Sequence, residues 1–227
     1  MQRRPPAPRR RPPSLARALV GVLALLLVGA CGSGVAASGT VKTEDRGLQG
    51  FDSVEFAAAG TLTIEQTGTD SVRISADEAY LPSLTSEVNG RTLRLGVRPG
   101  TSIDGGGDIR YTVTVASLTD LEVSGAGEVT VSGVDTPELA VVQSGAGRIT
   151  VTGRTTSSRV ELSGTGAYDG RGLAAENVDV SVSGAGSAEL TATATLNAQV
   201  SGVGDVGYLG DPTVTQEVSG VGEIKKL

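Results

Sequence analysis

The tetrapeptide Ser124-Gly125-Ala126-Gly127 returns five more times in the C-terminal half of the chain. The other copies are Ser144-Gly145-Ala146-Gly147, Ser163-Gly164-Thr165-Gly166, Ser183-Gly184-Ala185-Gly186, Ser201-Gly202-Val203-Gly204 and Ser219-Gly220-Val221-Gly222. Successive serines are 20, 19, 20, 18 and 18 residues apart. A nearly fixed period of this length indicates a repeat protein, in which each repeat is one supersecondary unit.

Apolar and polar residues alternate on both sides of each tetrapeptide. The positions one and three residues before the serine are mostly apolar, as are those five and seven residues after it, and the positions between them are mostly polar. Alternation with a period of two is typical of a strand that buries one face. Each repeat is therefore predicted to consist of two strands joined by a tight corner, with residues such as Val123 and Val129 pointing into the core.

The glycines of the tetrapeptides are predicted to form these corners. Glycine adopts positive φ freely and has no side chain to crowd the neighbouring coil. The predicted structural residues are Gly125, Gly127, Gly145, Gly147, Gly164, Gly166, Gly184, Gly186, Gly202, Gly204, Gly220 and Gly222.

One repeat of about 19 residues is too small to be stable alone. Burial of about four side chains contributes roughly 6–12 kcal/mol, whereas ordering the backbone costs roughly 1–2 kcal/mol per residue. Stacking completes the hydrogen-bond ladders and buries the edges of each repeat. We therefore predict an all-β fold in which residues 118–227 form a parallel β-helix, or β-solenoid, of about six coils. An antiparallel sandwich or barrel of short strands is the alternative.

The N-terminus resembles the leader of a bacterial lipoprotein. Residues 1–17 contain six arginines and no acid, and residues 18–30 are 13 consecutive apolar residues. Such a run is too short to span a bilayer as a helix but is typical of a signal peptide. It ends in Val28-Gly29-Ala30-Cys31, which resembles a lipobox, and Cys31 is the only cysteine in the chain. We predict a signal peptide over residues 1–30 and lipidation of Cys31; a plain secretory signal with an incidental cysteine is the alternative.

Cleavage before Cys31 would change the charge of the chain. Residues 1–30 contain six of the 19 basic residues and none of the 25 acidic ones, so the formal net charge would change from −6 to −12. A chain this acidic is unsuited to binding nucleic acid or anionic lipid headgroups. The predicted membrane attachment therefore depends on acyl chains.

The remaining residues divide into a tether and a folded domain. Residues 31–49 lack apolar periodicity and are predicted to be a flexible tether. Residues 50–227 are predicted to be one β domain, in which residues 50–117 contain strands near 51–56, 61–65, 72–76, 93–97 and 111–115. One short helical turn is expected within residues 77–84, where Pro82 limits its length. Asn89-Gly90 between two strands predicts a type I′ hairpin.

Four segments, in this order, resemble the "putative auto-transporter adhesin head GIN domain" family. They are Gly50-Phe51-Asp52-Ser53-Val54, Gly60-Thr61-Leu62-Thr63-Ile64-Glu65-Gln66, Val88-Asn89-Gly90-Arg91-Thr92-Leu93-Arg94-Leu95 and the repeated Ser-Gly-x-Gly. The resemblance covers roughly residues 50–227. It implies a right-handed β-helical or β-solenoid domain in a secreted or lipid-anchored envelope protein. It also implies a role in adhesion, and it brings no defined catalytic residues.

The sequence offers few groups for catalysis. The chain has no histidine, which excludes Ser-His-Asp and Cys-His arrangements and the usual zinc sites. No cofactor or metal site is predicted. Residues 202–207 match the dinucleotide-binding pattern G-x-G-x-x-G, but no helix is predicted to begin there, so we interpret them as a repeat corner.

Carboxylates and two tyrosines are the remaining candidates for a site. Glu122, Glu161 and Glu217 fall in one outward column, and Glu128, Asp205 and Glu223 fall in another. Paired acids at a suitable separation can hydrolyse glycosides, although outward acids are also simply solvated. Tyr168 and Tyr208 are predicted to point inward, which leaves Tyr80 and Tyr111 as the only candidates for exposed aromatic residues; core packing is the preferred interpretation for most of these tyrosines.

We therefore expect a lipid-anchored, extracytoplasmic protein without enzymatic activity, which binds a surface polysaccharide or protein or forms part of the envelope. The alternative is a β-helical carbohydrate-active enzyme that uses the outward carboxylates. Self-association is a third hypothesis, because the last coil would leave a free strand edge. Lys225 and Lys226 at that edge disfavour free stacking.

Overall fold

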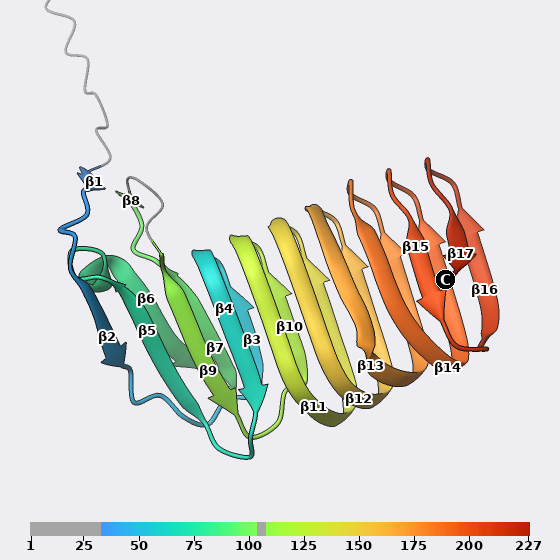
Figure 1. Cartoon of the computed structure of the whole chain (residues 1–227), viewed down its shortest axis with the longest axis horizontal. Helices are drawn as coiled ribbons and strands as arrows, with labels where there is room; N and C mark the ends of the chain where they lie inside the picture. Colours follow the sequence, from blue (N-terminus) through green and yellow to red (C-terminus); the bar gives the residue numbers. More distant parts are fainter. Residues whose placement is uncertain (1–32, 104–107) are drawn as a thin grey trace, which may run out of the picture. The chain divides into compact units, whose positions relative to one another are not determined.

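The computed structural model describes residues 33–103 and 108–227. The predicted signal peptide and Cys31 lie outside these residues. The described part is nearly all β and forms a β-solenoid of about five turns, where six coils were expected (Figure 1). The prediction of an all-β solenoid is confirmed. Within these two ranges, no helix is long and apolar enough to cross a membrane.

The strands follow one another along the chain, with one 3-10 helix, η1 (Leu81–Ser83), among them. They are β1 (Ser33–Val35), β2 (Val41–Asp45), β3 (Ser53–Phe56), β4 (Ala59–Gln66), β5 (Ser71–Asp77), β6 (Leu84–Asn89), β7 (Thr92–Val97), β8 (Thr101–Ile103), β9 (Arg110–Val115), β10 (Asp120–Val123), β11 (Ala126–Gln143), β12 (Ala146–Leu162), β13 (Thr165–Val182), β14 (Ser187–Val200), β15 (Val206–Leu209), β16 (Thr213–Val218) and β17 (Ile224–Lys226).

Three strands each run around almost a whole coil. β11, β12 and β13 contain 18, 17 and 18 residues. The two strands predicted for each repeat are therefore halves of one bent strand, and in β11 the register shifts between Val131 and Val134. Equal positions of successive repeats lie side by side, as Val129, Ile149 and Tyr168 do. All pairings among β10 to β17 are parallel, which excludes the antiparallel sandwich.

The predicted inward rows form the core of the coils. Before the serines, the buried residues are Leu121, Val141, Val160, Val180 and Ala198 in one row, and Val123, Gln143, Leu162, Val182 and Val200 in the other. After the serines, they are Val129, Ile149, Tyr168, Ala188 and Val206. Full burial of a large apolar side chain contributes about 1.5–3 kcal/mol. The last coil departs from the pattern, because Gln216 and Lys226 occupy inward rows and are exposed.

All twelve predicted corner glycines lie where the neighbouring coil leaves no room for a side chain. A Cβ atom on any of them would come within 1.7–2.5 Å of a backbone oxygen. On Gly184 it would lie 2.1 Å from the carbonyl oxygen of Gly164. The expectation of positive φ holds at Gly147 (φ 133) but is wrong for Gly184. Close approach of the coils is therefore the reason for glycine that all twelve corners share.

β3 and β4 form a further coil of the same stack. β3 pairs in parallel with β10 and β7, and β4 pairs in parallel with β11 and β9. The corner between them is Ala57-Ala58-Ala59-Gly60, with Ala59 beside Ala126 and Gly60 beside Gly127. The chain then builds the outer coil of β7 and β9 before it returns as β10 on the other side of β3. The coils are therefore not stacked in sequence order.

Antiparallel strands cover the N-terminal end of this stack. β6 pairs with β7, β5 with β9 and β2 with β5 (Figure 1). The prediction of a flexible tether over residues 31–49 is wrong for β2, and also for β1, which pairs with β8. All residues of β2 are exposed, so no apolar alternation marks this strand in the sequence.

Asp77 fastens the segment that precedes β2. Its Oδ1 atom accepts hydrogen bonds from the backbone N–H and the hydroxyl of Ser38, both at 2.9 Å. Its Oδ2 atom accepts one from the backbone N–H of Gly39 at 2.7 Å. These bonds, led by that from the N–H of Ser38, favour the ionised form and lower the pKa of Asp77 to about 2.

The β6–β7 hairpin confirms the Asn-Gly signal but not the predicted turn type. Asn89 pairs with Thr92, which leaves Gly90 and Arg91 as the loop. Gly90 has φ 63, and no described residue other than glycine has positive φ. Positive φ at the first loop residue alone fits a type II′ turn, whereas type I′ requires it at both.

Candidate functional site

One outward face of the coils carries three rows of mostly polar side chains. It is formed by β10, the C-terminal halves of β11 to β14, and β16, and is termed the grooved face below. The first row is Asp120, Ala140, Arg159, Asp179, Asn197 and Thr215; the second is Glu122, Val142, Glu161, Ser181, Gln199 and Glu217; the third is Glu138, Ser157, Asn177, Thr195 and Thr213.

These rows follow directly from the parallel register. Parallel strands lie about 4.8 Å apart, so each coil adds one side chain to each row at that interval. The residues between the rows, such as Val160, Val180 and Ala198, point inward and are buried. The polar side chains are therefore mounted on a packed sheet, which keeps their spacing constant.

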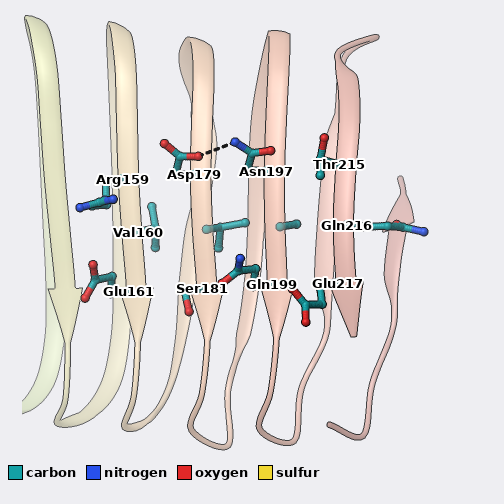
Figure 2. Close-up of a pocket in the computed structure, with 12 residues that line it drawn as sticks. Arg159, Val160, Glu161, Asp179, Ser181, Asn197, Gln199, Thr215, Gln216 and Glu217 are labelled. Carbon is teal, nitrogen blue, oxygen red and sulfur yellow. Dashed lines mark hydrogen bonds between the residues drawn. The ribbon is translucent and has the colours of Figure 1, made fainter. Parts of the chain in front are cut away.

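A groove of about 800 Å³ crosses β12, β13, β14 and β16 on this face. Figure 2 shows Arg159 and Glu161 at one end of the groove and Thr215 and Glu217 at the other. A second hollow of about 640 Å³ lies over β10, β11 and β12 and also includes Asp179. Both hollows include Arg159, so together they form one elongated surface across the strands.

Most polar side chains in the groove are available to a ligand. Asn197 donates a hydrogen bond from Nδ2 to Oδ1 of Asp179 at 2.9 Å, the dashed line in Figure 2. Among the described residues, no side-chain hydrogen bond or ion pair engages Arg159, Glu161, Ser181, Gln199 or Glu217. The groove therefore offers carboxylate, amide, hydroxyl and guanidinium groups whose hydrogen-bonding capacity is not used within the fold.

The grooved face is acidic, and its charges are unpaired. Its acids are Asp120, Glu122, Glu138, Glu161, Asp179 and Glu217, and its one base is Arg159. Every ion pair found among residues 33–103 and 108–227 lies elsewhere. The face thus carries a formal charge of −5 that nothing in the described structure neutralises.

The opposite face, formed by the N-terminal halves of the same coils, pairs several of its charges. Arg171 donates to both carboxylate oxygens of Asp169, at 2.9 and 2.7 Å, and lies 3.1 Å from Oε2 of Glu189. The hydrogen bonds from Arg171 lower the pKa of Asp169. Lys225 likewise pairs with Glu223. On this face Asp169, Glu189 and Glu223 are engaged in ion pairs, whereas no ion pair among the described residues engages Glu128.

The predicted column of Glu122, Glu161 and Glu217 shares one row, but its members are not neighbours. One strand separates Glu122 from Glu161, and two strands separate Glu161 from Glu217. At about 4.8 Å per strand, their backbones are about 10 and 14 Å apart. Catalytic carboxyls of glycosidases lie about 5–9.5 Å apart. Asp179 lies diagonally across from Glu161, but both are exposed, whereas burial keeps a general acid protonated.

The second predicted column, Glu128, Asp205 and Glu223, lies on the opposite face and is dispersed. Arg148 stands beside Glu128 in this row. Asp205 accepts a hydrogen bond on Oδ1 from the backbone N–H of Glu223 at 2.9 Å. It therefore helps to hold the last coil.

Aromatic side chains do not contribute a platform on the described surface. Tyr80 and Tyr111, the two candidates for exposed aromatic residues, are each only 1% exposed, in agreement with the preferred interpretation of core packing. Tyr111 packs edge-on against Phe56, with ring centroids 5.2 Å apart, and its burial raises its pKa. Tyr168 is buried as predicted, and Tyr208 is half-buried.

In the described residues, no group of three or more His, Cys, Asp or Glu side chains is placed to hold a metal ion.

Known proteins share this fold, and one family model matches most of the sequence. The family model described as "Putative auto-transporter adhesin, head GIN domain" matches residues 50–212. A crystal structure of a putative adhesin from Bacteroides fragilis has a TM-score of 0.73 and 23% identity, covering 86% of this chain and 100% of that one. No curated protein matches the sequence significantly.

Two structures from Parabacteroides distasonis are less similar. One is described as a putative adhesin (TM-score 0.50, 19% identity) and the other as a putative lipid binding protein (TM-score 0.50, 17% identity). Each comparison covers 86% of this chain and 100% of the other. At these identities the likeness shows the fold alone.

Proposed function

This chain belongs to the family described as "Putative auto-transporter adhesin, head GIN domain", and we propose that it is a non-enzymatic binding protein of the bacterial envelope. The family match supports a role in adhesion at the cell surface. The grooved face is the surface that we assign to the ligand.

One observation carries this assignment. The groove crosses four strands, and its side chains are held on a packed sheet while most of their polar groups, the Asn197–Asp179 pair apart, lack partners within the described fold. A polar group that makes no internal bond contributes nothing to the fold through hydrogen bonding and can bind a ligand without first breaking a contact. The opposite face, where Arg171 already engages Asp169 and Glu189, would have to give up ion pairs to do the same.

Binding is favoured over catalysis by the chemistry of the chain. It has no histidine, and the backbones of the second-row glutamates are about 10 and 14 Å apart, whereas the catalytic carboxyls of glycosidases lie about 5–9.5 Å apart. The alternative, a carbohydrate-active enzyme with outward-facing carboxylates, remains an outcome of the experiment below.

We further propose that the protein is lipid-anchored through Cys31. The support is the apolar run over residues 18–30 and the lipobox-like Val28-Gly29-Ala30-Cys31. Replacing Cys31 by Ser removes the thiol that would be acylated. The variant is expected in the soluble fraction of a bacterial host, while the unchanged chain stays with the membranes after a carbonate wash. Retention of Cys31→Ser on washed membranes would contradict the anchor.

The binding proposal is tested with two matched triple variants. The groove variant combines Glu161→Gln, Asp179→Asn and Glu217→Gln. The control variant combines Glu65→Gln, Glu87→Gln and Glu128→Gln, which removes the same number of exposed acids away from the groove.

The full chain and both variants, purified in non-ionic detergent, are applied to an array of envelope and host polysaccharides and surface proteins. Retained protein and released reducing ends are measured in the same wells. Retention that falls only in the groove variant supports the proposal. Retention that is equal in all three chains contradicts the assignment of the groove, and release of reducing ends would establish the enzymatic alternative.

A further inference from the structure

We propose that the grooved face binds a basic, extended segment of a polypeptide partner. This inference rests on the proposed function, because it names the class of ligand for the same surface.

The charge of the face selects a cationic ligand. Six carboxylates and one guanidinium lie on it, and the described ion pairs are all elsewhere. Like charges held at fixed spacing on a sheet repel one another, and a cationic ligand relieves this repulsion as it binds. An anionic polysaccharide or a nucleic acid would increase it.

The shape of the face selects an elongated ligand. The two hollows adjoin at Arg159 and together extend from Asp120 on β10 to Thr215 on β16. Six strands at about 4.8 Å span roughly 24 Å. An extended polypeptide rises about 3.3 Å per residue, so about seven residues would cover this length. A compact small molecule would contact only part of the surface.

The chemistry of the lining favours a peptide over a sugar. Carboxylates bind the ammonium of lysine and, in bidentate fashion, the guanidinium of arginine. The amide of Gln199 and the hydroxyls of Ser181 and Thr215 can donate to and accept from a peptide backbone. Aromatic rings, on which sugars commonly stack, do not line either hollow.

The positive charge of Arg159 restricts how a basic ligand can be positioned along the grooved face. It stands between Ala140 and Asp179 in the first row and belongs to both hollows. A lysine or arginine of the ligand placed over Arg159 would be repelled, so the ligand is expected to present a neutral or acidic residue there. This position therefore limits the register in which a basic segment can bind.

The probe is a fluorescent dodecapeptide of alternating lysine and serine, titrated with the full chain in non-ionic detergent at low salt. Fluorescence anisotropy measures its dissociation constant. The groove variant is expected to bind about tenfold more weakly, equivalent to about 1.4 kcal/mol. The control variant should change binding less than about twofold. Arg159→Gln should strengthen binding about twofold or more, because it removes the one like charge.

The outcomes that overturn the inference are specific. A matched peptide of alternating glutamine and serine that binds as tightly as the lysine peptide would show that charge is not recognised. Equal losses in the groove and control variants would show that net charge alone attracts the peptide. Weaker binding by Arg159→Gln would contradict the register argument. Circular dichroism melting of every variant shows that each one folds.

The array separates this inference from the proposed function. If a polysaccharide is retained through the groove and the lysine peptide is not bound, the binding proposal stands and the peptide inference fails. If neither ligand responds to the groove variant, both fail.

Discussion

The two outward faces of the coils have the same backbone and the same spacing but use their charges differently. On the opposite face, Asp169, Arg171 and Glu189 engage one another across adjacent coils. On the grooved face, Glu161, Arg159 and Asp179 stand on adjacent strands with no ion pair between them. Ion pairs on one face therefore help to hold the stack together, and the lack of them on the other supports our proposal that the grooved face binds a ligand.

Substitutions at the corners should have the largest effect on stability, because both faces depend on the close packing of the coils there. Gly184→Val places a Cβ atom where the carbonyl oxygen of Gly164 would be 2.1 Å away. The two coils must separate, so the free energy of unfolding should fall by about 3 kcal/mol or more. Chemical denaturation followed by circular dichroism measures this loss.

A matched control lies next to it in the same corner. Ala185→Val adds the same side chain at a position where later repeats already carry Val203 and Val221, so it should change stability by less than about 1 kcal/mol. Equal losses in the two variants would mean that the coils do not approach each other most closely at Gly184.

Asp77 is a carboxylate that is used within the fold at the N-terminal end of the stack, where it accepts hydrogen bonds from Ser38 and Gly39. Its folded pKa of about 2 lies below the usual value near 3.9. Its contribution is therefore complete above about pH 4 and is lost as the pH falls toward 2. Asp77→Asn should release the segment before β2 at neutral pH, which appears as faster amide hydrogen exchange over residues 38–45.

Glu78→Gln is the control for this change, since Glu78 pairs only with the exposed Lys42. Exchange that accelerates equally in the two variants would show that Asp77 has no special role in docking the segment.

The arginines of the two faces allow a direct comparison. Arg171→Ala removes two ion pairs whose members are partly exposed, so it should lower the free energy of unfolding by about 0.5–1 kcal/mol. Arg159→Ala removes no ion pair and should cost less than about 0.5 kcal/mol. Denaturation curves of the two variants measure both changes in the free energy of unfolding. A larger loss from Arg159→Ala would show that the grooved face also stabilises the fold.

The groove variant should have the smallest effect on stability. It neutralises three acids that lack cationic partners in the described structure, so the melting temperature should stay unchanged or rise slightly. Asp169→Asn, which leaves Arg171 without its nearest carboxylate, should lower it. A clear loss in the groove variant would mean that its carboxylates are structural.

The repeat coils were predictable because their pattern is local and recurs. Residue spacing alone predicts which side chains of β11 to β14 point inward, and burial of Val141, Ile149 and Val182 confirms it. The glycines were found for a partly wrong reason, since Gly184 needs space rather than positive φ. Periodicity shows where a small residue is required but not which constraint requires it.

The predicted strands near 51–56, 61–65, 72–76, 93–97 and 111–115 are confirmed, but β2 and the stacking order at the N-terminal end were not predictable from the same signals. Ala57 and Ala58 replace the Ser-Gly of the later corners, which hides the coil of β3 and β4. β2 is held by backbone pairing and by Asp77 rather than by apolar burial. The stacking order depends on long-range pairing, which no local pattern specifies. The packing partner of Tyr111 was not predictable for the same reason, because Phe56 is distant in the sequence.

The groove was only partly predictable from the sequence. The rows that contain Glu161 and Glu217 follow from the repeat, but the absence of partners around them does not. Whether an acid is paired depends on which side chains reach it. Arg171, two residues along the same strand, engages Asp169, whereas Asp179 accepts a hydrogen bond from the neutral amide of Asn197 on β14.

Carboxyl footprinting in the presence of a retained ligand tests the central claim most directly. A carbodiimide and an amine probe label exposed carboxylates, and mass spectrometry reports the labelling of each one with and without ligand. Bound ligand should protect Glu161, Asp179 and Glu217, while Glu65 and Glu128 remain labelled as before. Protection of Glu65 and Glu128, with Glu161 and Glu217 still fully labelled, would contradict the assignment of binding to the grooved face.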